Sequence, residues 1–510
     1  MVTRRRASIA APNSQATLAA AQVLEEGGSA VDAAVAAMLS ATVTEPGVVA
    51  PLGGCYVNVW PPDGDPVVID GNVEMPGRGQ PLDRFGSGLI ESRSEYGGGM
   101  VTFVGPGSVA TPGTFAGLGW AHERFGRIPW ALLIQPAVGV ARGGFALGRT
   151  SQSYLALVAD TIMSWDPHTR ALLTVNGMAP EVGHIICDEV LAQSLEEIGA
   201  EGWRTVYTGD IASKIDNDMR VRGGLLRKAD LQAYKPVVRP ALRTALGEWG
   251  LACNPPPSVG GPVLTALLRL LSTVGREITP ASAAAIMKEV LDIRLDRIDT
   301  AADLAAAGAE LLDTLHAIGA TGLPTSPSTA HVSIVDSHGF ACAITASAGY
   351  CSGMTVSGTG LMANNALGEL ELNRLGLHSL QPGTRLASNM APTTGRSKDG
   401  AAIAIGSPGA DRITTALAQV ILHVACHGED LQTAVDRPRM HPRRLDDGST
   451  RVEHEQDAMI AASLDAAGLA RHEHPLHVMY FGGVGAALRT GEGQLQAAAD
   501  PRREAATLIT

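Results

Sequence analysis

The chain has 510 residues, enough to bury a large core, and its length alone suggests two or three domains. Its formal net charge is −12 at pH 7 and the charged residues are interspersed, so we expect no nucleic-acid partner. No apolar run of about 18 residues occurs, so we expect neither a transmembrane span nor a membrane partner.

The six cysteines are scattered and include no CxxC pair, so neither a zinc site nor a disulfide framework is indicated. We expect them to be buried thiols in a reducing compartment. After the arginines at positions 4–6, the next segment is short and is broken by Pro12 and Asn13, unlike the apolar part of a signal peptide. The sequence thus predicts a cytoplasmic protein, and we expect no metal or other cofactor.

Two amphipathic helices are predicted over residues 14–40, because the apolar pattern there is interrupted by Gly27-Gly28. Ser29 begins the second helix, with Asp32 three residues later in the spacing of a capping box. Farther along, an Ala- and Leu-rich stretch predicts one long helix from about residue 281 to residue 317.

Strand patterns dominate after residue 329. We expect strands over 331–336, 340–347, 361–365, 401–405 and 478–488, and helices over 412–427 and 455–468. The first two strands alternate apolar residues around Ser337-His338-Gly339, which indicates a β-hairpin. We therefore expect the second segment, residues 329–510, to carry most of the sheet to which the 331–336 strand belongs.

A Pro-, Ser- and Thr-rich stretch runs directly into this hairpin at Thr329. One interpretation is that Ser328 or Thr329 merely begins a strand. The other is that Thr329 cuts the Ser328–Thr329 peptide bond, so that the new N-terminal threonine supplies both a hydroxyl nucleophile and an α-amine base. An α-amine suits this task because its ordinary pKa of about 7.7–8.0 leaves it partly neutral at pH 7.

About 80 residues after Thr329, a Gly-rich turn leads into an apolar helix; the turn reads Gly406-Ser407-Pro408-Gly409-Ala410. Backbone N–H groups at such a turn can be aimed at an oxyanion. Between the two motifs lie Asn364-Asn365 and a polar loop that contains Ser388-Asn389.

Together these segments resemble the γ-glutamyltranspeptidase family of N-terminal nucleophile hydrolases, whose nucleophile lies in a Thr-Thr-His or Thr-Ala-His run. Here the run reads Thr329-Ala330-His331. The match continues in order through residues 24–36, 51–56 and 500–503. The resemblance implies an α+β fold, a four-layer αββα sandwich with two stacked, mainly antiparallel sheets flanked by helices.

The same resemblance implies one intertwined domain made of two segments, 1–328 and 329–510. They would be the large and small subunits after self-cleavage, held as an αβ heterodimer and possibly as a dimer of these. Thr329 would be the nucleophile and Ser347, in place of a family threonine, would hydrogen-bond it. Gly409 and Ala410 would hold the oxyanion, which alanine permits if its φ is negative.

The resemblance also locates candidate substrate-binding residues, and several depart from the family pattern. These candidates are Asn72, Asn365, Glu369, Ser388 and Asn389. Glu369 replaces the aspartate that grips the glutamyl α-ammonium, and Ser388-Asn389 replaces the Ser-Ser pair that holds the α-carboxylate. The family's asparagine falls at Gly349, and its carboxylate-binding arginine falls near Asn72, where no arginine stands.

Losing such a charged clamp typically costs several kcal/mol of binding. We therefore predict a self-processing hydrolase for a small, acidic, non-glutamyl substrate, which it would cleave at an amide or an activated C–C bond. Oxamate hydrolysis and oxalyl release in alkylproline-type antibiotic biosynthesis are examples. The alternatives are a genuine γ-glutamyltransferase or glutathione hydrolase, supported by Glu369 and Ser388, and a non-catalytic binding relative.

Other chemistries lack their motifs, because the chain contains neither a GxSxG elbow nor a GxxxxGK[ST] loop. The His-rich run Arg471-His472-Glu473-His474, with His477, does not have HExxH spacing. We interpret it as solvated polar residues before a strand, and we expect no metal there.

Overall fold

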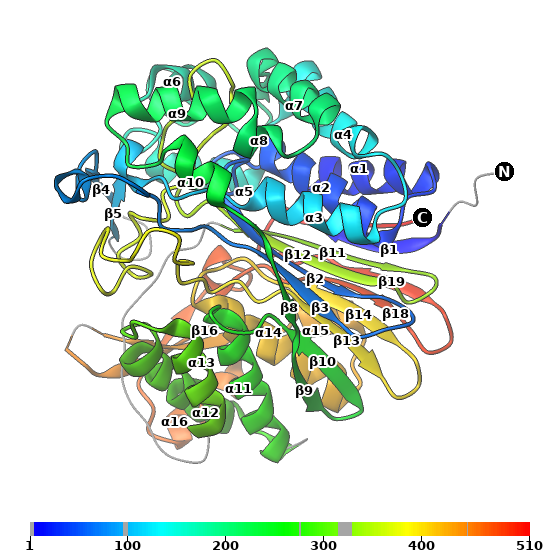
Figure 1. Cartoon of the computed structure of the whole chain (residues 1–510). Helices are drawn as coiled ribbons and strands as arrows, with labels where there is room; N and C mark the ends of the chain where they lie inside the picture. Colours follow the sequence, from blue (N-terminus) through cyan, green and yellow to red (C-terminus); the bar gives the residue numbers. More distant parts are fainter. Residues whose placement is uncertain (1–4, 95–99, 275–276, 315–328, 446) are drawn as a thin grey trace.

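The computed structural model describes residues 5–94, 100–274, 277–314, 329–445 and 447–510. Two sheets lie face to face at its centre, and helices cover both outer faces (Figure 1). This is the α+β, four-layer αββα sandwich that the sequence predicted. No helix among the described residues is both long enough and apolar enough to cross a membrane.

The first sheet has seven strands in the order β20-β1-β11-β12-β2-β3-β8, and all of its neighbouring pairs are antiparallel. Its strands are β1 (Ala7–Ala11), β2 (Gly54–Trp60), β3 (Val67–Gly71), β8 (Val237–Pro240), β11 (Ala330–Asp336), β12 (Ala341–Ser347) and β20 (Ala506–Ile509). The β11–β12 hairpin is the one predicted from the alternating pattern.

The second sheet has six strands in the order β19-β18-β14-β13-β10-β9, again antiparallel. Its strands are β9 (Leu242–Leu246), β10 (Trp249–Cys253), β13 (Thr393–Ser397), β14 (Ala402–Gly406), β18 (Gly485–Arg489) and β19 (Leu495–Ala498). Both central sheets combine strands from before and from after Thr329. In the first sheet, β1, β2, β3 and β8 precede Thr329, so the prediction that residues 329–510 carry most of the nucleophile's sheet was wrong.

The upper face in Figure 1 is covered by helices from the first half of the chain, and α2 and α3 lie against the first sheet. These helices are α1 (Ser14–Glu25), α2 (Ala30–Thr44), α3 (Thr114–Phe125), α4 (Trp130–Gly143), α5 (Arg149–Val158), α6 (Pro167–Leu173), α7 (Glu189–Glu201), α8 (Thr205–Thr208), α9 (Asp210–Arg222) and α10 (Lys228–Ala233). Two short hairpins accompany them, β4 (Ile90–Ser94) with β5 (Met100–Val104), and β6 (Phe145–Ala146) with β7 (Ile185–Ile186).

The lower face is covered by helices that pack on the second sheet, chiefly α11 and α14. These helices are α11 (Gly260–Val274), α12 (Pro280–Ile293), α13 (Leu304–Thr314), α14 (Arg412–Leu422), α15 (Leu431–Asp436) and α16 (Ala458–Ala466). A small sheet made of β15 (Met440–Arg444), β16 (Thr450–Glu455) and β17 (Arg471–His474) lies beside them.

Alanine explains how closely the two central sheets approach. A buried cluster between them consists of Val335 and five alanines, Ala341, Ala343, Ala402, Ala404 and Ala487. Small side chains let two sheet faces pack without voids, because there is little volume to interdigitate. The high alanine content of the chain thus serves the centre of the sandwich.

Local sequence signals predicted the first helices correctly. The Ser29 side chain accepts a hydrogen bond from the Asp32 N–H, and Asp32 Oδ2 accepts one from the Ser29 N–H, which completes the capping box. The α1 and α2 helices are separated at Gly27-Gly28, as expected.

Several predicted elements were wrong. The long helix over 281–317 is broken into α12, a π-helical turn at Arg294–Ile298 and α13. The break arises because the Asp303 side chain accepts from the N–H groups of Ala305 and Ala306 and so begins a new helix. Residues 315–317 lie outside the described residues. Residues 361–365 form only isolated bridges, and the strand predicted over 478–488 is limited to β18. The His-rich run is itself a strand, β17, and Cys187 is an exposed thiol rather than a buried one.

Candidate active site

The β11–β12 register places the predicted nucleophile beside its predicted partner. Ala330 pairs with Ala346 across the hairpin, so the next position outward brings Thr329 opposite Ser347. Thr329 is buried, whereas Ser347 is half-buried and accepts a hydrogen bond from the Gly349 N–H. The other half of the predicted cleavage site, Ser328, lies outside the described residues.

A small cleft of about 30 Å³ contains this pair, and we call it the Thr329 cleft. It is lined by Thr329, Ser347, Glu369, Glu371, Leu372, Ser388, Asn389, Met390, Ala410 and Ile413. Five segments that are distant in sequence therefore meet at one end of the sheets. Two buried carboxylates face the space, and no basic side chain lines it within the described part of the chain.

The turn between β14 and α14 forms one side of this cleft, because its residue Ala410 lines the space. Gly409 has φ 125° and Ala410 has φ 57°, so the condition that Ala410 have a negative φ is not met. An L-residue in the left-handed region costs about 1–2 kcal/mol, and such strain is common at functional turns. The carbonyl groups of Gly409 and Ala410 accept from Arg412 and Ile413, whereas neither N–H donates to another described residue.

Glu369 depends on the absence of a side chain at position 349. A Cβ added to Gly349 would lie 2.6 Å from Glu369 Oε1 and 2.3 Å from Asn365 Oδ1, and Gly349 also has φ 62°. Only glycine fits such a position without a shift of its neighbours. The absence of a side chain at Gly349 therefore leaves room for the side chains of Glu369 and Asn365.

Sequence reasoning missed Glu371. Its side chain is buried beside the cleft, and its Oε1 accepts a hydrogen bond from the Tyr350 hydroxyl at 3.1 Å. Glu371 lies in an irregular loop without periodicity, so the only available signal was its position two residues after Glu369.

Ser388 and Asn389 both line the cleft, as expected for substrate-binding residues. Ser388 Oγ accepts from the Met390 N–H, and the Ser388 carbonyl accepts from the N–H groups of Val259 and Gly260. Asn389 Oδ1 is buried and has no hydrogen-bond partner among the described residues. An unsatisfied buried acceptor costs about 1–3 kcal/mol, so this amide is suited to receive a donor from a ligand.

Asn72 and Asn365 are not brought to the cleft, and both have structural hydrogen bonds instead. Asn72 Nδ2 donates to the Leu386 carbonyl at 2.8 Å. Asn365 Nδ2 donates to Thr102 Oγ1 and the Phe103 carbonyl, while its Oδ1 accepts from the Tyr350 N–H. These amides hold the loops that form the site rather than lining it.

His331, two residues after the nucleophile, is not positioned as a general base. Its Nε2 lies 2.7 Å from Ser333 Oγ, which itself donates to the Gly485 carbonyl, and its Nδ1 lies 2.8 Å from Thr345 Oγ1. Burial lowers the pKa of His331 to about 3. The imidazole is therefore neutral, and both ring nitrogens are occupied by hydroxyl groups.

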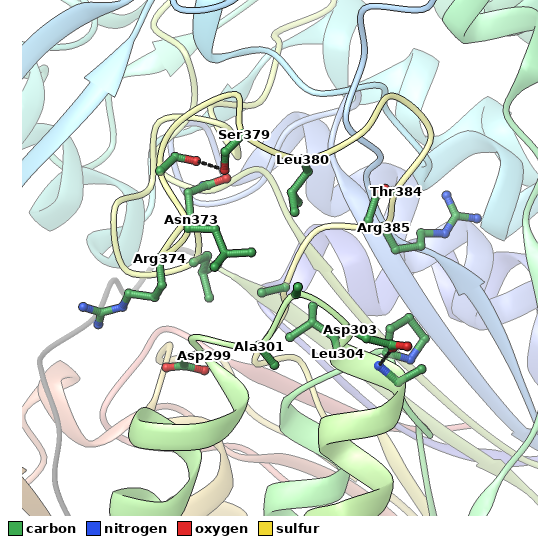
Figure 2. A pocket seen from close by; sticks show the side chains of 17 residues that line it. Asp299, Ala301, Asp303, Leu304, Asn373, Arg374, Ser379, Leu380, Thr384 and Arg385 are labelled. Carbon is green, nitrogen blue, oxygen red and sulfur yellow. Dashed lines mark hydrogen bonds between the residues drawn. The ribbon is translucent and has the colours of Figure 1, made fainter.

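A larger cavity of about 380 Å³ is drawn in Figure 2. It adjoins the Thr329 cleft, because Leu372 lines both spaces. We call it the Leu380 cavity; it is lined by Pro257, residues 299 and 301–305, residues 372–376, and residues 379, 380, 384, 385 and 387. One wall is the irregular loop before β13, and the other is the start of α13 and the turn that precedes it.

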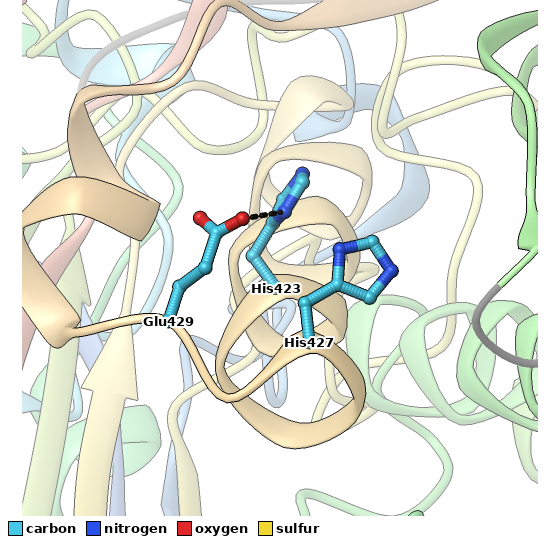
Figure 3. A group of neighbouring side chains, drawn as sticks. All are labelled: His423, His427 and Glu429. Atoms are coloured by element: carbon cyan, nitrogen blue, oxygen red, sulfur yellow. Dashed lines mark hydrogen bonds and ion pairs between the residues drawn. The ribbon is translucent and has the colours of Figure 1, made fainter.

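Among the described residues, two groups of side chains have the composition of a metal site, but neither lines the Thr329 cleft. His423, His427 and Glu429 form the first, at the end of α14 (Figure 3). Both Glu429 oxygens are held by Arg437 at 2.6 Å, so a cation would have to displace a guanidinium group. In the second, Glu453 accepts from Arg451 and is paired with His474. We assign no metal to either group.

Comparisons with known proteins identify the family of the chain. A family model described as Gamma-glutamyltranspeptidase matches residues 16–510. The chain is 30% identical over 516 residues to the acylase ACY 1 proenzyme of Pseudomonas sp. (strain SE83), covering 95% of this chain and 90% of that protein. It is 27% identical over 544 residues to the glutathione hydrolase proenzyme of Escherichia coli (strain K12), covering 98% and 91%.

Solved structures show the same fold. The cephalosporin acylase from Bacillus halodurans superimposes with a TM-score of 0.78 at 19% identity, covering 99% of this chain and 96% of that one. A structure of LmbA gives a TM-score of 0.78 at 23% identity, covering 99% and 98%. The fold is that of the N-terminal nucleophile hydrolases. Within that class, the chain belongs to the γ-glutamyltranspeptidase family and is a hydrolase of that family.

Proposed function

We propose that this chain is a proenzyme that cuts itself before Thr329 and then hydrolyses an amide through the new N-terminal threonine. The single observation that carries the proposal is the hairpin register, which brings Thr329 opposite Ser347 in a cleft that also contains the Ala410 turn. Two relatives whose names include the word proenzyme support self-cleavage into segments 1–328 and 329–510, held together as an αβ heterodimer.

In the first half of the reaction, Thr329 Oγ attacks the amide carbonyl carbon and its proton passes to the threonine α-amine. The N–H groups of Gly409 and Ala410 would stabilise the resulting oxyanion. The C–N bond then breaks, and the α-ammonium returns the proton to the leaving amine. His331 does not compete for this role, because both of its ring nitrogens are occupied.

In the second half, water attacks the Thr329 ester and gives one proton to the α-amine. Collapse of the second tetrahedral intermediate breaks the bond to Oγ, which takes that proton, and the acid is released. Ser347 would donate a hydrogen bond to Thr329 Oγ and so position it for both steps. The α-amine thus moves every proton, and the chain's backbone stabilises the charge.

The chemistry of the cleft favours a substrate whose acyl group carries an ammonium group. Glu369 and Glu371 line the space together, and among the described residues no lysine or arginine does. An acidic acyl group, such as the oxalyl group of the sequence-based prediction, would bring a further negative charge next to these carboxylates at a cost in binding. Asn389 Oδ1 would accept a hydrogen bond from the same ammonium group.

A γ-glutamyl substrate is the second candidate, because Glu369 and Ser388 both line the cleft. It requires a binding site for an α-carboxylate. The described residues offer that carboxylate no cation in the cleft, so we expect γ-glutamyl amides to be cleaved more slowly than aminoacyl amides.

Mass spectrometry of the purified protein tests self-cleavage, with fragments 1–328 and 329–510 as the expected result. The processed protein is then assayed with L-alanine p-nitroanilide, N-acetyl-L-alanine p-nitroanilide and γ-L-glutamyl p-nitroanilide. We expect the free aminoacyl amide to be cleaved most rapidly. An intact, inactive chain would refute the enzymatic proposal, and faster cleavage of the γ-glutamyl amide would establish the second candidate.

A further inference from the structure

The Leu380 cavity is positioned to extend the acyl-binding end of the Thr329 cleft. Leu372 is common to both spaces and directly follows Glu371 in the chain, while Ala387 of the cavity directly precedes Ser388 of the cleft. The cavity shares no lining residue with the Ala410 turn or with Ser347. It therefore adjoins the carboxylate side of the cleft, away from the turn at which the oxyanion forms.

Several polar side chains of this cavity are already engaged within the protein, whereas Asp299 Oδ2 is buried without a hydrogen-bond partner among the described residues. Asn373 Nδ2 donates to the carbonyls of Ala366 and Glu369, and Asp303 Oδ1 accepts from the start of α13. Arg385 is paired with Glu74 at 2.9 Å and lies over the Tyr234 ring. Figure 2 shows the guanidinium groups of Arg374 and Arg385 pointing away from the centre of the cavity.

Apart from Asp299, the cavity offers a ligand mainly apolar surface, chiefly from Leu304, Leu372, Leu375 and Leu380. An apolar cavity of about 150 Å³ is large enough to hold benzene. At about 380 Å³, this cavity has room for an aromatic or branched alkyl side chain. The adjoining cleft, at about 30 Å³, has room only for the groups next to the reacting carbonyl.

We propose that the Leu380 cavity binds an apolar side chain on the acyl group, so that the substrates are amides of hydrophobic amino acids. The inference rests on the proposed hydrolase function. In this arrangement Glu369 and Glu371 face the α-ammonium group, Thr329 faces the carbonyl carbon, and the side chain passes Leu372 into the cavity. The preference for one acyl side chain over another is then set partly by the start of α13, which lines the cavity and lies more than 20 residues before the nucleophile in sequence.

The kinetic test compares L-phenylalanine, L-leucine and L-alanine p-nitroanilides on the processed wild-type protein. Since each buried methylene group contributes about fourfold, we expect kcat/KM for the phenylalanine amide to exceed that for the alanine amide by about tenfold or more. The Ala305→Trp variant places a large ring at an exposed position of the cavity wall and should remove this preference, while cleavage of the alanine amide stays within about twofold of wild type.

Ala306→Trp is the matched control, because Ala306 is the next residue of α13, is also exposed, and does not line the cavity. It should retain the wild-type preference. Equal kcat/KM values for the three amides in the wild type, or an Ala305→Trp variant that keeps the preference, would overturn the inference.

A binding measurement separates this inference from the proposed function. L-Phenylalaninol has the ammonium group and the aromatic side chain but no carbonyl to attack, and L-alaninol lacks the aromatic ring. Calorimetry on the wild type should show the former binding about tenfold more tightly, and Ala305→Trp should abolish the difference. If no amide is cleaved but this binding pattern holds, the cavity assignment stands and the hydrolase proposal fails; equal affinities would overturn the cavity assignment.

Discussion

The Thr329 cleft and the Leu380 cavity are both lined by Leu372, yet they differ in size and in the chemical character of their other lining residues. In the cleft, the Asn389 amide oxygen has no hydrogen-bond partner within the described part of the chain, and two carboxylates line a space of about 30 Å³. In the cavity of about 380 Å³, charged groups such as Arg385 and Asp303 are already hydrogen-bonded within the protein. The first arrangement suits chemistry and the second suits the burial of apolar surface.

The comparison shows why cavity size alone does not locate an active site. The larger space offers a ligand mainly apolar surface, whereas the smaller one contains the predicted nucleophile, two carboxylates and the Asn389 amide oxygen. The group of His423, His427 and Glu429 has the composition of a metal site, but both oxygens of Glu429 accept hydrogen bonds from Arg437. Composition alone therefore does not identify a binding site either. Variants that change the cleft should therefore alter the reaction, and variants that change other regions should alter stability or specificity.

The largest effect is expected from Thr329→Ala, which removes the hydroxyl that cuts both the chain and the substrate. Self-cleavage should not occur, and amide hydrolysis should fall by about 10³-fold or more. Gel electrophoresis and a p-nitroanilide assay measure the two effects. Thr329→Ser is the control, since it keeps a hydroxyl group and should still be processed. Normal processing of Thr329→Ala would exclude Thr329 as the nucleophile.

A smaller effect is expected from Glu369→Gln, which keeps the shape of the side chain but removes its charge. If the carboxylate binds an ammonium group, KM for L-alanine p-nitroanilide should rise by about 30-fold, as for other truncated buried charge pairs. KM for an N-acetylated amide should change little. Glu429→Gln provides the control, because its carboxylate is held by Arg437 and does not line the cleft. A similar rise for both substrates would argue against an ammonium-binding role.

Gly349→Ala tests how tightly the cleft is built around Glu369. The new Cβ would lie 2.6 Å from the Glu369 carboxylate in a backbone with φ 62°, so we expect the free energy of unfolding to fall by about 2–4 kcal/mol. Gly358→Ala is matched to it, because Gly358 has φ 70° but nothing within 4 Å of the added Cβ. Urea unfolding should show a loss of only about 1 kcal/mol for the control. Equal losses would show that the space at Gly349 is not needed.

The hairpin around the nucleophile and the capped first helices could be predicted from sequence, because both depend on signals a few residues apart. The alternating residues of β11 and β12 fix which side chains share a face, and Ser29 with Asp32 fixes a helix start. The family resemblance added the order of the layers, which no local pattern contains.

Other features depended on contacts between distant segments and were missed for that reason. Glu371 lies in a loop without periodicity, and the positive φ of Ala410 violates the expectation for alanine. Asn72 was expected at the substrate, but its amide is bonded to Leu386, which is more than 300 residues away in the chain. The Leu380 cavity joins residues 299–305 to residues 372–387, so no single stretch of sequence indicates it.

The pH dependence of the free energy of unfolding tests whether His331 is buried in its neutral form. Its folded pKa is about 3 against an ordinary value of 6.5, so below pH 6.5 the unfolded chain binds a proton that the folded chain does not. Stability should therefore fall as the pH decreases, by about 2 kcal/mol between pH 7 and pH 5 from this residue alone. Urea unfolding of wild type and His331→Gln at several pH values measures the difference. Parallel curves would show that His331 is not buried in its neutral form.

The smallest effect is expected from Ala410→Gly. This variant tests whether Ala410 acts through its backbone N–H group or through its side chain. If Ala410 contributes only its N–H group to the oxyanion, removing its methyl group should change kcat by less than about threefold. The φ of 57° is easier for glycine, so relief of strain should offset the greater entropy of the unfolded chain and leave stability within about 1 kcal/mol. Ala410→Pro is the informative contrast, since it removes the N–H and cannot adopt that φ. If Ala410→Gly lowers kcat as strongly as Ala410→Pro does, the strained side chain itself positions the turn, and the oxyanion role of the backbone would have to be reassigned.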